Sequence, residues 1–298
     1  MPTRPPLHIV TGKGGVGKTT VALALAHRLA IDGARVVVAE VEGRGGLGRA
    51  TGRPIGPEPS ALLRTGRGRV LGVQIDARVA LAGDLQRYYR LGFAADLLQL
   101  EPLVDFATRI APGLRDILLI GQVTHLIDNR PDIDALVLDA PPSGRIGPFL
   151  GAGAALAELT DGSPISGQAA SVMDDLRDPG CRVHVVTLLE ELPVTEAVET
   201  VRTISHLGLL PGAVIANRCL PAPEIPDPLP AAPAGIDARS WAAMTADLVA
   251  EGETARAQRA WQELLGHRTG VGVRRLPEVV SATASELPAL LGAELGAW

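Results

Sequence analysis

The chain has 298 residues, a formal net charge of −5, 46% hydrophobic residues and 20% charged residues. Its apolar content excludes an intrinsically disordered chain, and its length allows a large hydrophobic core. The net negative charge argues against a nucleic-acid-binding protein, which needs a concentrated basic surface.

The first forty residues predict a strand, a loop, a helix and a second strand. Residues 7–11 are apolar and partly β-branched, and they end in glycines. A helical pattern covers residues 19–31, and residues 35–41 form a continuous apolar run. Such runs are typical of buried parallel strands, so this region predicts an α/β fold.

The next segment alternates between loop and helix signals. Residues 43–68 are rich in Gly, Arg and Pro and predict a mobile loop, and residues 69–76 predict a strand. Residues 77–130 carry a helical pattern, which we interpret as a helical insertion. Its apolar faces either pack over the sheet, as most such faces do, or form a client groove. Residues 146–178 are a possible second part of this subdomain.

The remainder continues the α/β alternation. Strands are expected at 135–139, 182–188 and 213–216. Helices are expected at 146–159, 164–176, 194–207 and 239–265, the last with a possible break near Gly252, and a short helix after Ser285. Residues 221–233 hold six prolines and predict an irregular loop. We expect a single domain over residues 1–298.

A glycine-rich octapeptide follows the first strand and opens the first helix. Residues 12–19 read GKGGVGKT and fit the phosphate-binding pattern G-x-x-x-x-G-K-[ST] in the required context. Backbone N–H groups and the helix N-terminus would surround phosphates, Lys18 would reach the β- and γ-phosphates, and Thr19 would ligate Mg²⁺. The candidate nucleotide-binding residues are Gly12, Gly14, Gly15, Val16, Gly17, Lys18, Thr19 and Thr20.

Lysine occurs in this chain at two positions, and both lie in the octapeptide. Of 28 basic residues, Lys13 and Lys18 are the lysines and the others are arginines. A solvated cation tolerates either residue, whereas a loop that closes on phosphate does not accept the wide guanidinium equally well. The composition therefore indicates that both Lys13 and Lys18 are chemically constrained.

This form of the loop, with a lysine directly after the first glycine, resembles the deviant Walker A motif of the SIMIBI class of P-loop ATPases. The class includes MinD, ParA, the nitrogenase iron protein and ArsA. The resemblance implies a mostly parallel P-loop NTPase sheet with helices on both faces. It also implies that Lys13 acts across a dimer on the partner's nucleotide, so that one subunit cannot complete the active site alone.

The strand ending at Asp139 predicts the acid that organises Mg²⁺. The segment 139–145, DAPPSGR, resembles the ArsA-type switch D-T-A-P-T-G-H more than the shorter MinD-type switch. Arg145 stands where that family usually has histidine. The resemblance to ArsA-like ATPases covers residues 7–220 well and is strongest for the short bacterial members, which are related to the tail-anchored-protein targeting factors and are often made as two related subunits.

The water-orienting acid departs from the family's pattern. ArsA-like proteins place D-x-D-P-A after the second strand, and this chain has EVEGR at 40–44, with Glu42 at the second acid. Glutamate is one methylene longer, and a displacement of about 1 Å can cost about a hundredfold in rate. Slow hydrolysis and a mainly nucleotide-binding subunit are both consistent with Glu42.

Three further residues are assigned to the nucleotide by the resemblance. Asn217, followed by Arg218 at the end of a strand, matches the asparagine that reads the adenine edge, and an amide can both donate and accept there. Pro277 matches a proline beside the adenine. Isolated Cys181 and Cys219 do not match the cysteine cluster of arsenite pumps, the C-x-x-C zinc site of tail-anchored targeting factors, or the cluster cysteines of the iron protein.

These patterns predict a cytoplasmic ATP- and Mg²⁺-dependent ATPase with catalytic Lys13, Lys18, Glu42 and Asp139 and metal ligands Thr19 and Asp139. It would work as a homo-dimer or as a hetero-dimer with a related subunit, acting on a client or membrane-protein partner through the helical insertion. No run of about eighteen apolar residues predicts a transmembrane segment. The alternatives are a regulatory nucleotide-binding subunit paired with a catalytic paralogue, and a P-loop small-molecule kinase.

Overall fold

The computed structural model describes residues 4–41, 43, 45–77, 112–159, 164–221, 225–226, 228–280, 282–283 and 285–296. Its strands form one eight-stranded sheet in the order β3-β4-β2-β5-β1-β6-β7-β8, parallel except for β3. The strands are β1 (Leu7–Gly12), β2 (Arg35–Val41), β3 (Ser60–Thr65), β4 (Gly68–Ile75), β5 (Ala135–Asp139), β6 (Cys181–Thr187), β7 (Pro211–Cys219) and β8 (Val273–Pro277).

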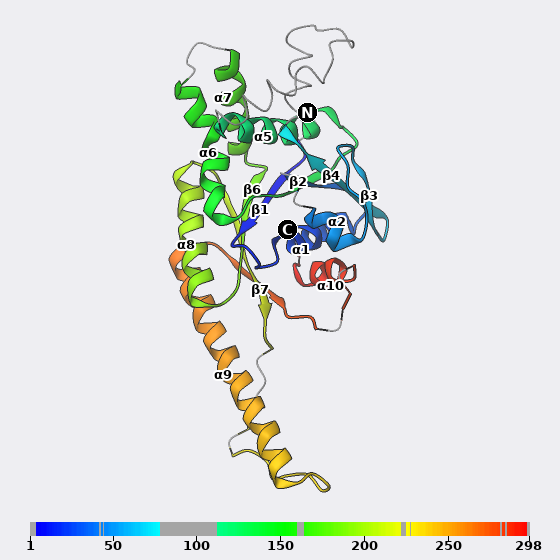
Figure 1. Ribbon diagram of the computed structural model, residues 1–298, viewed down its shortest axis with the longest axis vertical. Helices are drawn as coiled ribbons and strands as arrows, with labels where there is room; N and C mark the ends of the chain where they lie inside the picture. Colours follow the sequence, from blue (N-terminus) through cyan, green and yellow to red (C-terminus); the bar gives the residue numbers. More distant parts are fainter. Residues whose placement is uncertain are drawn as a thin grey trace.

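Helices cover both faces of the sheet (Figure 1). On one face lie α5 (Pro112–Asn129), α6 (Ser143–Leu159), α7 (Pro164–Arg177), α8 (Glu191–His206) and the C-terminal part of α9 (Ala238–Thr269). On the other face lie α1 (Lys18–Ala30), α2 (Gly46–Thr51) and α10 (Leu287–Glu294). The expected α/β fold, with a mostly parallel sheet covered on both faces, is confirmed.

Alternation along the central strands divides the core into two layers. In β2, Val37 and Ala39 face the α5–α9 layer, whereas Val36 and Val38 face the α1 layer. All four side chains are fully buried. A strand buried on both faces must be apolar at every position, which explains the continuous hydrophobic run in this strand.

The structure corrects three expectations of regular structure. The loop expected at 43–68 contains helix α2 and the antiparallel edge strand β3. Strand β8, which was not expected, pairs in parallel with β7. Its half-buried arginines interrupt the apolar pattern by which a strand is recognised in a sequence. Helix α9 continues through Gly252 without the break that was considered possible there, and the missing side chain leaves room for Ile225.

The described part of the expected helical insertion is α5. Its apolar side chains, including Ile117, Leu119 and Val123, belong to the same core as the sheet and α6. The rest of the predicted insertion, residues 78–111, lies outside the described residues. Its assignment as a client-binding subdomain therefore stays a prediction.

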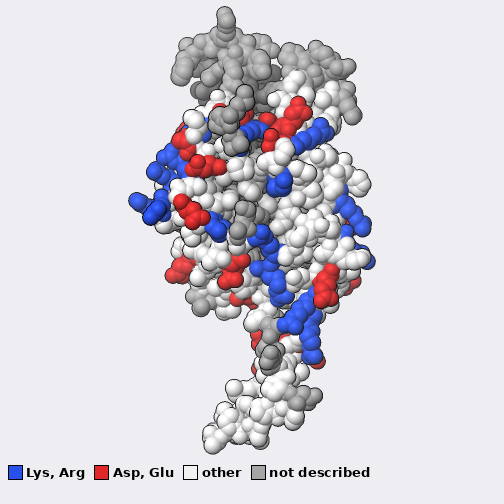
Figure 2. All heavy atoms as spheres, turned by 180° about the vertical axis from the view of Figure 1, so that it is seen from behind, with Lys and Arg blue, Asp and Glu red and all other residues white. Residues whose placement is uncertain are grey.

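The N-terminal half of α9 projects beyond the body of the molecule (Figure 1). The buried residues of this helix are Gly252, Ala255 and Leu265, and none of them precedes Gly252. Trp241 donates from Nε1 to the carbonyl of Pro230 at 3.1 Å, so the preceding proline-rich segment runs along the helix. Viewed from behind, the end of the projection is mostly uncharged (Figure 2).

Among the described helices, none is both long and apolar enough to span a membrane.

Two histidines form a polar pair inside the sheet. Rings of His8 on β1 and His184 on β6 are stacked with centroids 5.3 Å apart, and His8 Nδ1 lies 3.0 Å from His184 Nε2. The N–H of Ala213 donates to His184 Nδ1. His184 therefore carries its proton on Nε2 and donates it to His8. Burial lowers the pKa of His8 to about 4 and that of His184 to about 3.

The histidine pair predicts acid sensitivity of the fold. Both folded-state pKa values lie below the unfolded value of about 6.5, so the unfolded chain binds more protons. Their contribution to stability is complete above pH 6.5 and declines as the pH falls toward 4. Urea unfolding should show a loss of roughly 1–2 kcal/mol per histidine between pH 7.5 and pH 5.

His184→Asn should flatten this pH dependence, because Asn keeps an acceptor for Ala213 and does not titrate. His206→Asn is the matched control, since His206 is exposed. Equal pH dependence in wild type and His184→Asn would contradict the assignment.

Candidate nucleotide-binding site

The candidate residues gather at the carboxyl edge of the central strands. Strand β1 lies between β5 and β6, and β5 lies between β1 and β2. The chain leaves β1 to form α1 on one face, while β6 continues into α8 on the other face. Ligands of open parallel sheets bind at such a change of direction, outside the carboxyl ends of the strands.

Glycine backbone geometry shapes the loop between β1 and α1. Gly12 has φ +147°, and a Cβ there would lie 2.1 Å from the carbonyl oxygen of Val186 on β6. Gly17 has φ +93°, and its Cβ would lie 2.4 Å from Asn217 Nδ2. By contrast, a Cβ at Gly14 or Gly15 would point into open space. The loop is thus pressed against the sheet at both ends and open at its middle, as a phosphate cradle requires.

The helix-opening residues of the loop carry the polar contacts. Lys18 Nζ donates to the carbonyl of Lys13 at 2.9 Å, so the ammonium group closes back over the loop. Thr19 Oγ1 donates to Asp139 Oδ2 at 2.6 Å. Asp139 is 2% exposed at the end of β5. Thr20, which follows in α1, is half-buried. The structure therefore brings together the three side chains that the sequence predicted for phosphate and metal.

Glu40 is a site residue that the sequence analysis did not single out. It pairs in register with Asp139 on the neighbouring strand and is 2% exposed. Its Oε1 accepts the N–H of Gly46 at 2.6 Å, and its Oε2 accepts the N–H of Leu47 at 3.3 Å. Glu40 thus satisfies the N-terminus of α2 and holds that helix beside Thr19. The sequence signal that could have identified Glu40 is an acidic residue within the otherwise apolar strand β2.

Asn217 supports the phosphate loop from β7. Its Nδ2 donates to the carbonyl of Val16 at 2.8 Å, and the residue is 5% exposed. The pairing of β7 with β8 shifts register between Ala216 and Cys219, and Arg218 has φ +54° at that point. This bulge turns Arg218 outward and Asn217 toward the loop, as bulges near binding sites often do.

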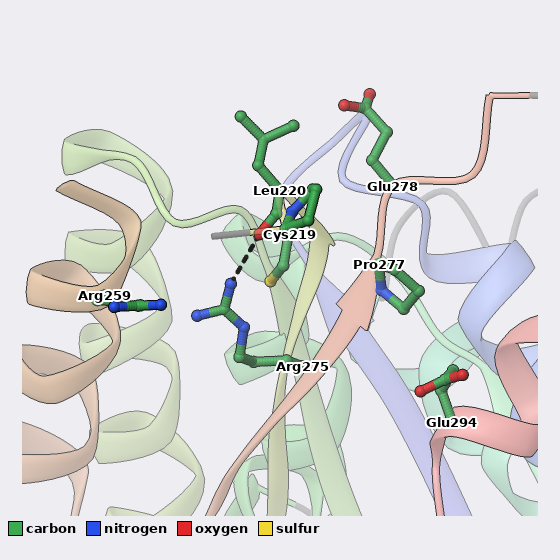
Figure 3. A pocket seen from close by; sticks show the side chains of 8 residues that line it. Cys219, Leu220, Arg259, Arg275, Pro277, Glu278 and Glu294 are labelled. Carbon is green, nitrogen blue, oxygen red and sulfur yellow. Dashed lines mark hydrogen bonds between the residues drawn. The ribbon is translucent and has the colours of Figure 1, made fainter. Parts of the chain in front are cut away.

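Pro277 lines a cavity at the carboxyl ends of β7 and β8. The cavity has a volume of about 570 Å³, a typical size for a ligand pocket. Figure 3 shows Cys219 and Leu220 at the end of β7, Pro277 and Glu278 at the end of β8, and Arg259 on α9 around it. Arg275 closes one side by donating to the carbonyl of Leu220 at 3.1 Å. The strand register pairs Pro277 with Cys219, two positions after Asn217 on β7.

Lys13 points away from the loop toward α8. Its Nζ lies 2.6 Å from Glu196 Oε1, and each side chain is 38% exposed. Arg145, in the first turn of α6, lies 3.1 Å from Asp116 on α5. Glu42 lies outside the described residues, so its position is not part of this geometry.

Comparison with known proteins agrees with this arrangement. The profile of the ArsA-type family described as anion-transporting ATPases matches residues 7–158. The "ATPase BagA" of Mycobacterium tuberculosis is 40% identical over 242 residues, which span 78% of this chain and 71% of that protein.

The chain belongs to the ArsA-type ATPase family.

More distant relatives extend the comparison. An "Arsenical pump-driving ATPase" of Escherichia coli is 27% identical over 237 residues, 72% of this chain and 39% of that protein. One with the same name from Acidiphilium multivorum is 27% identical over 250 residues, 74% of this chain and 40% of that protein. The family membership makes this chain an ATP-binding ATPase.

The donor set near Thr19 fits Mg²⁺. The ion prefers oxygen ligands and is usually held by one or two protein groups together with substrate phosphates. Thr19 Oγ1 and Asp139 Oδ2 are such oxygens, 2.6 Å apart at the base of the open loop. Among the described residues, no group of three His, Cys, Asp or Glu side chains could hold a metal ion alone. An ion here would therefore depend on bound phosphate.

The hydrogen bond from Asn217 to Val16 predicts a loss of loop order on mutation. Asn217→Ala leaves a buried carbonyl without its donor, which should cost about 1–3 kcal/mol in the free energy of unfolding. Hydrogen exchange of amides 12–18 should accelerate. Asn129→Ala is the control, because Asn129 bonds within its own helical turn. Unchanged exchange in the loop of Asn217→Ala would refute the supporting role.

Proposed function

We propose that this chain is a Mg²⁺-dependent ATPase that works as a nucleotide-gated dimer, in which ATP hydrolysis drives a change of shape that acts on a client or partner protein. The observation that carries the proposal is the contact between Thr19 and Asp139 beneath a loop that opens at Gly14 and Gly15. This is the minimal arrangement for holding phosphates with a metal ion.

The chain's own residues divide the work of binding. The middle of the loop receives the phosphates. The Lys18 ammonium group, which donates to the carbonyl of Lys13 in this structure, would donate to a phosphate oxygen instead. Thr19 and Asp139 hold Mg²⁺, which neutralises charge on the phosphates when it is bound. Asn217 holds the loop through Val16, and the cavity beside Pro277 accepts the adenine. Arg218 is an exposed residue at the same end of β7.

The position of Lys13 supports the proposal of a dimer. Its ammonium group is directed to α8 rather than over its own loop, so this lysine does not complete the phosphate site of its own subunit. We therefore propose that Lys13 serves the nucleotide of a second subunit, either an identical chain or a related one. A supply of ATP and two free, buried thiols fit a cytoplasmic location.

The path from nucleotide to client begins at the segment after Asp139. That segment leads into α6, where Arg145 contacts Asp116 of α5. We propose that changes at Asp139 reach the expected helical insertion, residues 77–130, through this ion pair. Helices α6 and α7, which together include most of residues 146–178, pack against α5 and would move with it.

The two lysines should separate binding from turnover. Lys18→Ala is expected to lower ATP affinity at least about tenfold, because it removes the phosphate-facing charge. Lys13→Ala should keep nucleotide binding and lose hydrolysis. Titration with a fluorescent ATP analogue and phosphate-release assays would measure the two effects. An equal loss of binding in both variants would remove the argument for action across a dimer.

A second candidate function is a regulatory nucleotide-binding subunit with little turnover, paired with a catalytic paralogue. The observation that favours it is Glu42, which stands where the family places aspartate. Lengthening the acid by one methylene displaces the group that orients the attacking water.

Glu42 variants should decide between these functions. If the isolated chain is a working ATPase, Glu42→Ala should abolish its hydrolysis, and Glu42→Asp should change the rate by up to about a hundredfold. Steady-state phosphate release is the measurement, and Glu58→Asp, at an exposed glutamate, is the control. An inactive wild type whose activity appears only in Glu42→Asp would establish the regulatory function instead.

A further inference from the structure

Helix α8 contributes a carboxylate to the surroundings of the phosphate loop. Glu196 lies in the second turn of α8 and its side chain is 38% exposed. Its Oε1 lies 2.6 Å from Lys13 Nζ, and its Oε2 accepts a long hydrogen bond of 3.4 Å from Ser143 Oγ. One carboxylate therefore contacts both the phosphate loop and the start of α6.

The partner residues of Glu196 belong to the two segments that surround the phosphates. Lys13 follows the first glycine of the loop, and Ser143 follows Asp139 by four positions. The same segment is tied to β1 where Thr11 Oγ1 donates to the carbonyl of Pro141 at 2.7 Å. Glu196 thus connects the phosphate loop to the segment that follows Asp139, and it does so from α8, a helix that belongs to neither segment.

The ion pair directs the Lys13 side chain toward α8. Lysine has a flexible four-carbon stem, so the ammonium group can reach alternative sites from one backbone position. An ion pair between half-exposed groups contributes little free energy and is screened by salt. Glu196 can therefore hold Lys13 and still release it to a stronger anion.

We propose that Glu196 is a positioning residue that keeps Lys13 directed away from its own phosphate loop until a nucleotide phosphate replaces the carboxylate. The inference deepens the proposed function, since Lys13 needs a second subunit's nucleotide as its destination. When Lys13 leaves, Glu196 keeps its contact with Ser143, so the carboxylate links release of Lys13 to the segment that follows Asp139.

The chain's lysine content allows a direct test of the pairing. Lys13 and Lys18 are the two lysines of the sequence, so acylation by an amine-reactive ester, read by peptide mass spectrometry, reports each one separately. In the nucleotide-free protein, Glu196→Gln should raise the acylation rate of Lys13 by about two- to fivefold, the range expected for a half-exposed ion pair. Lys18 is the internal reference, and its rate should stay within error.

Glu199→Gln is the matched control, because Glu199 lies on α8 with an exposed side chain and the substitution removes the same charge. A Lys13 rate that rises equally in Glu196→Gln and Glu199→Gln, or that does not rise in Glu196→Gln, overturns the proposal. This measurement requires no hydrolysis, so it tests Glu196 even if the chain proves to have no ATPase activity.

A second measurement addresses the consequence for turnover. Glu196→Gln should lower the ATP concentration for half-maximal phosphate release by about two- to fivefold and leave the maximal rate unchanged, because Lys13 no longer has to be displaced. Glu199→Gln should match wild type. A fall in the maximal rate without a change in the half-maximal concentration would show that Glu196 acts structurally and would overturn the positioning role.

Discussion

The close approach of β1 to β6 at Gly12 is the constraint on which the site depends. The carbonyl of Val186 occupies the space that a Cβ of Gly12 would need, and the positive φ of Gly12 turns the chain out of the sheet there. Strand β1 consequently ends at this point, and the following residues form a loop instead of continuing the strand.

Local sequence predicted the parts of the site whose signal lies within a few residues. The phosphate loop was predicted because its glycines, lysine and threonine are contiguous between a strand and a helix. Asp139 was predicted because it ends an apolar strand. Asn217 and Pro277 required family resemblance, since each is a single residue at the end of a strand and has no pattern of its own.

The sequence did not predict the contacts between segments that are far apart in the chain. Helix α2 has a glycine-rich sequence of low helix propensity, and it forms because Glu40 accepts its first N–H groups. Strand β8 carries two adjacent arginines and is recognisable as a strand through its pairing with β7. Glu196 lies 183 positions from Lys13, and no motif links the two. Tertiary contacts supplied the stabilisation that local propensity lacked in each case.

The hydrogen bond between Asn217 and Val16 joins residues 201 positions apart. The segment that the family profile matches, residues 7–158, contains the loop but not this support. During synthesis, the phosphate loop would thus emerge long before the strand that braces it. Bound nucleotide favours the folded state by mass action. A nucleotide bound at the loop would therefore stabilise the packing of two segments that lie 201 positions apart in the chain.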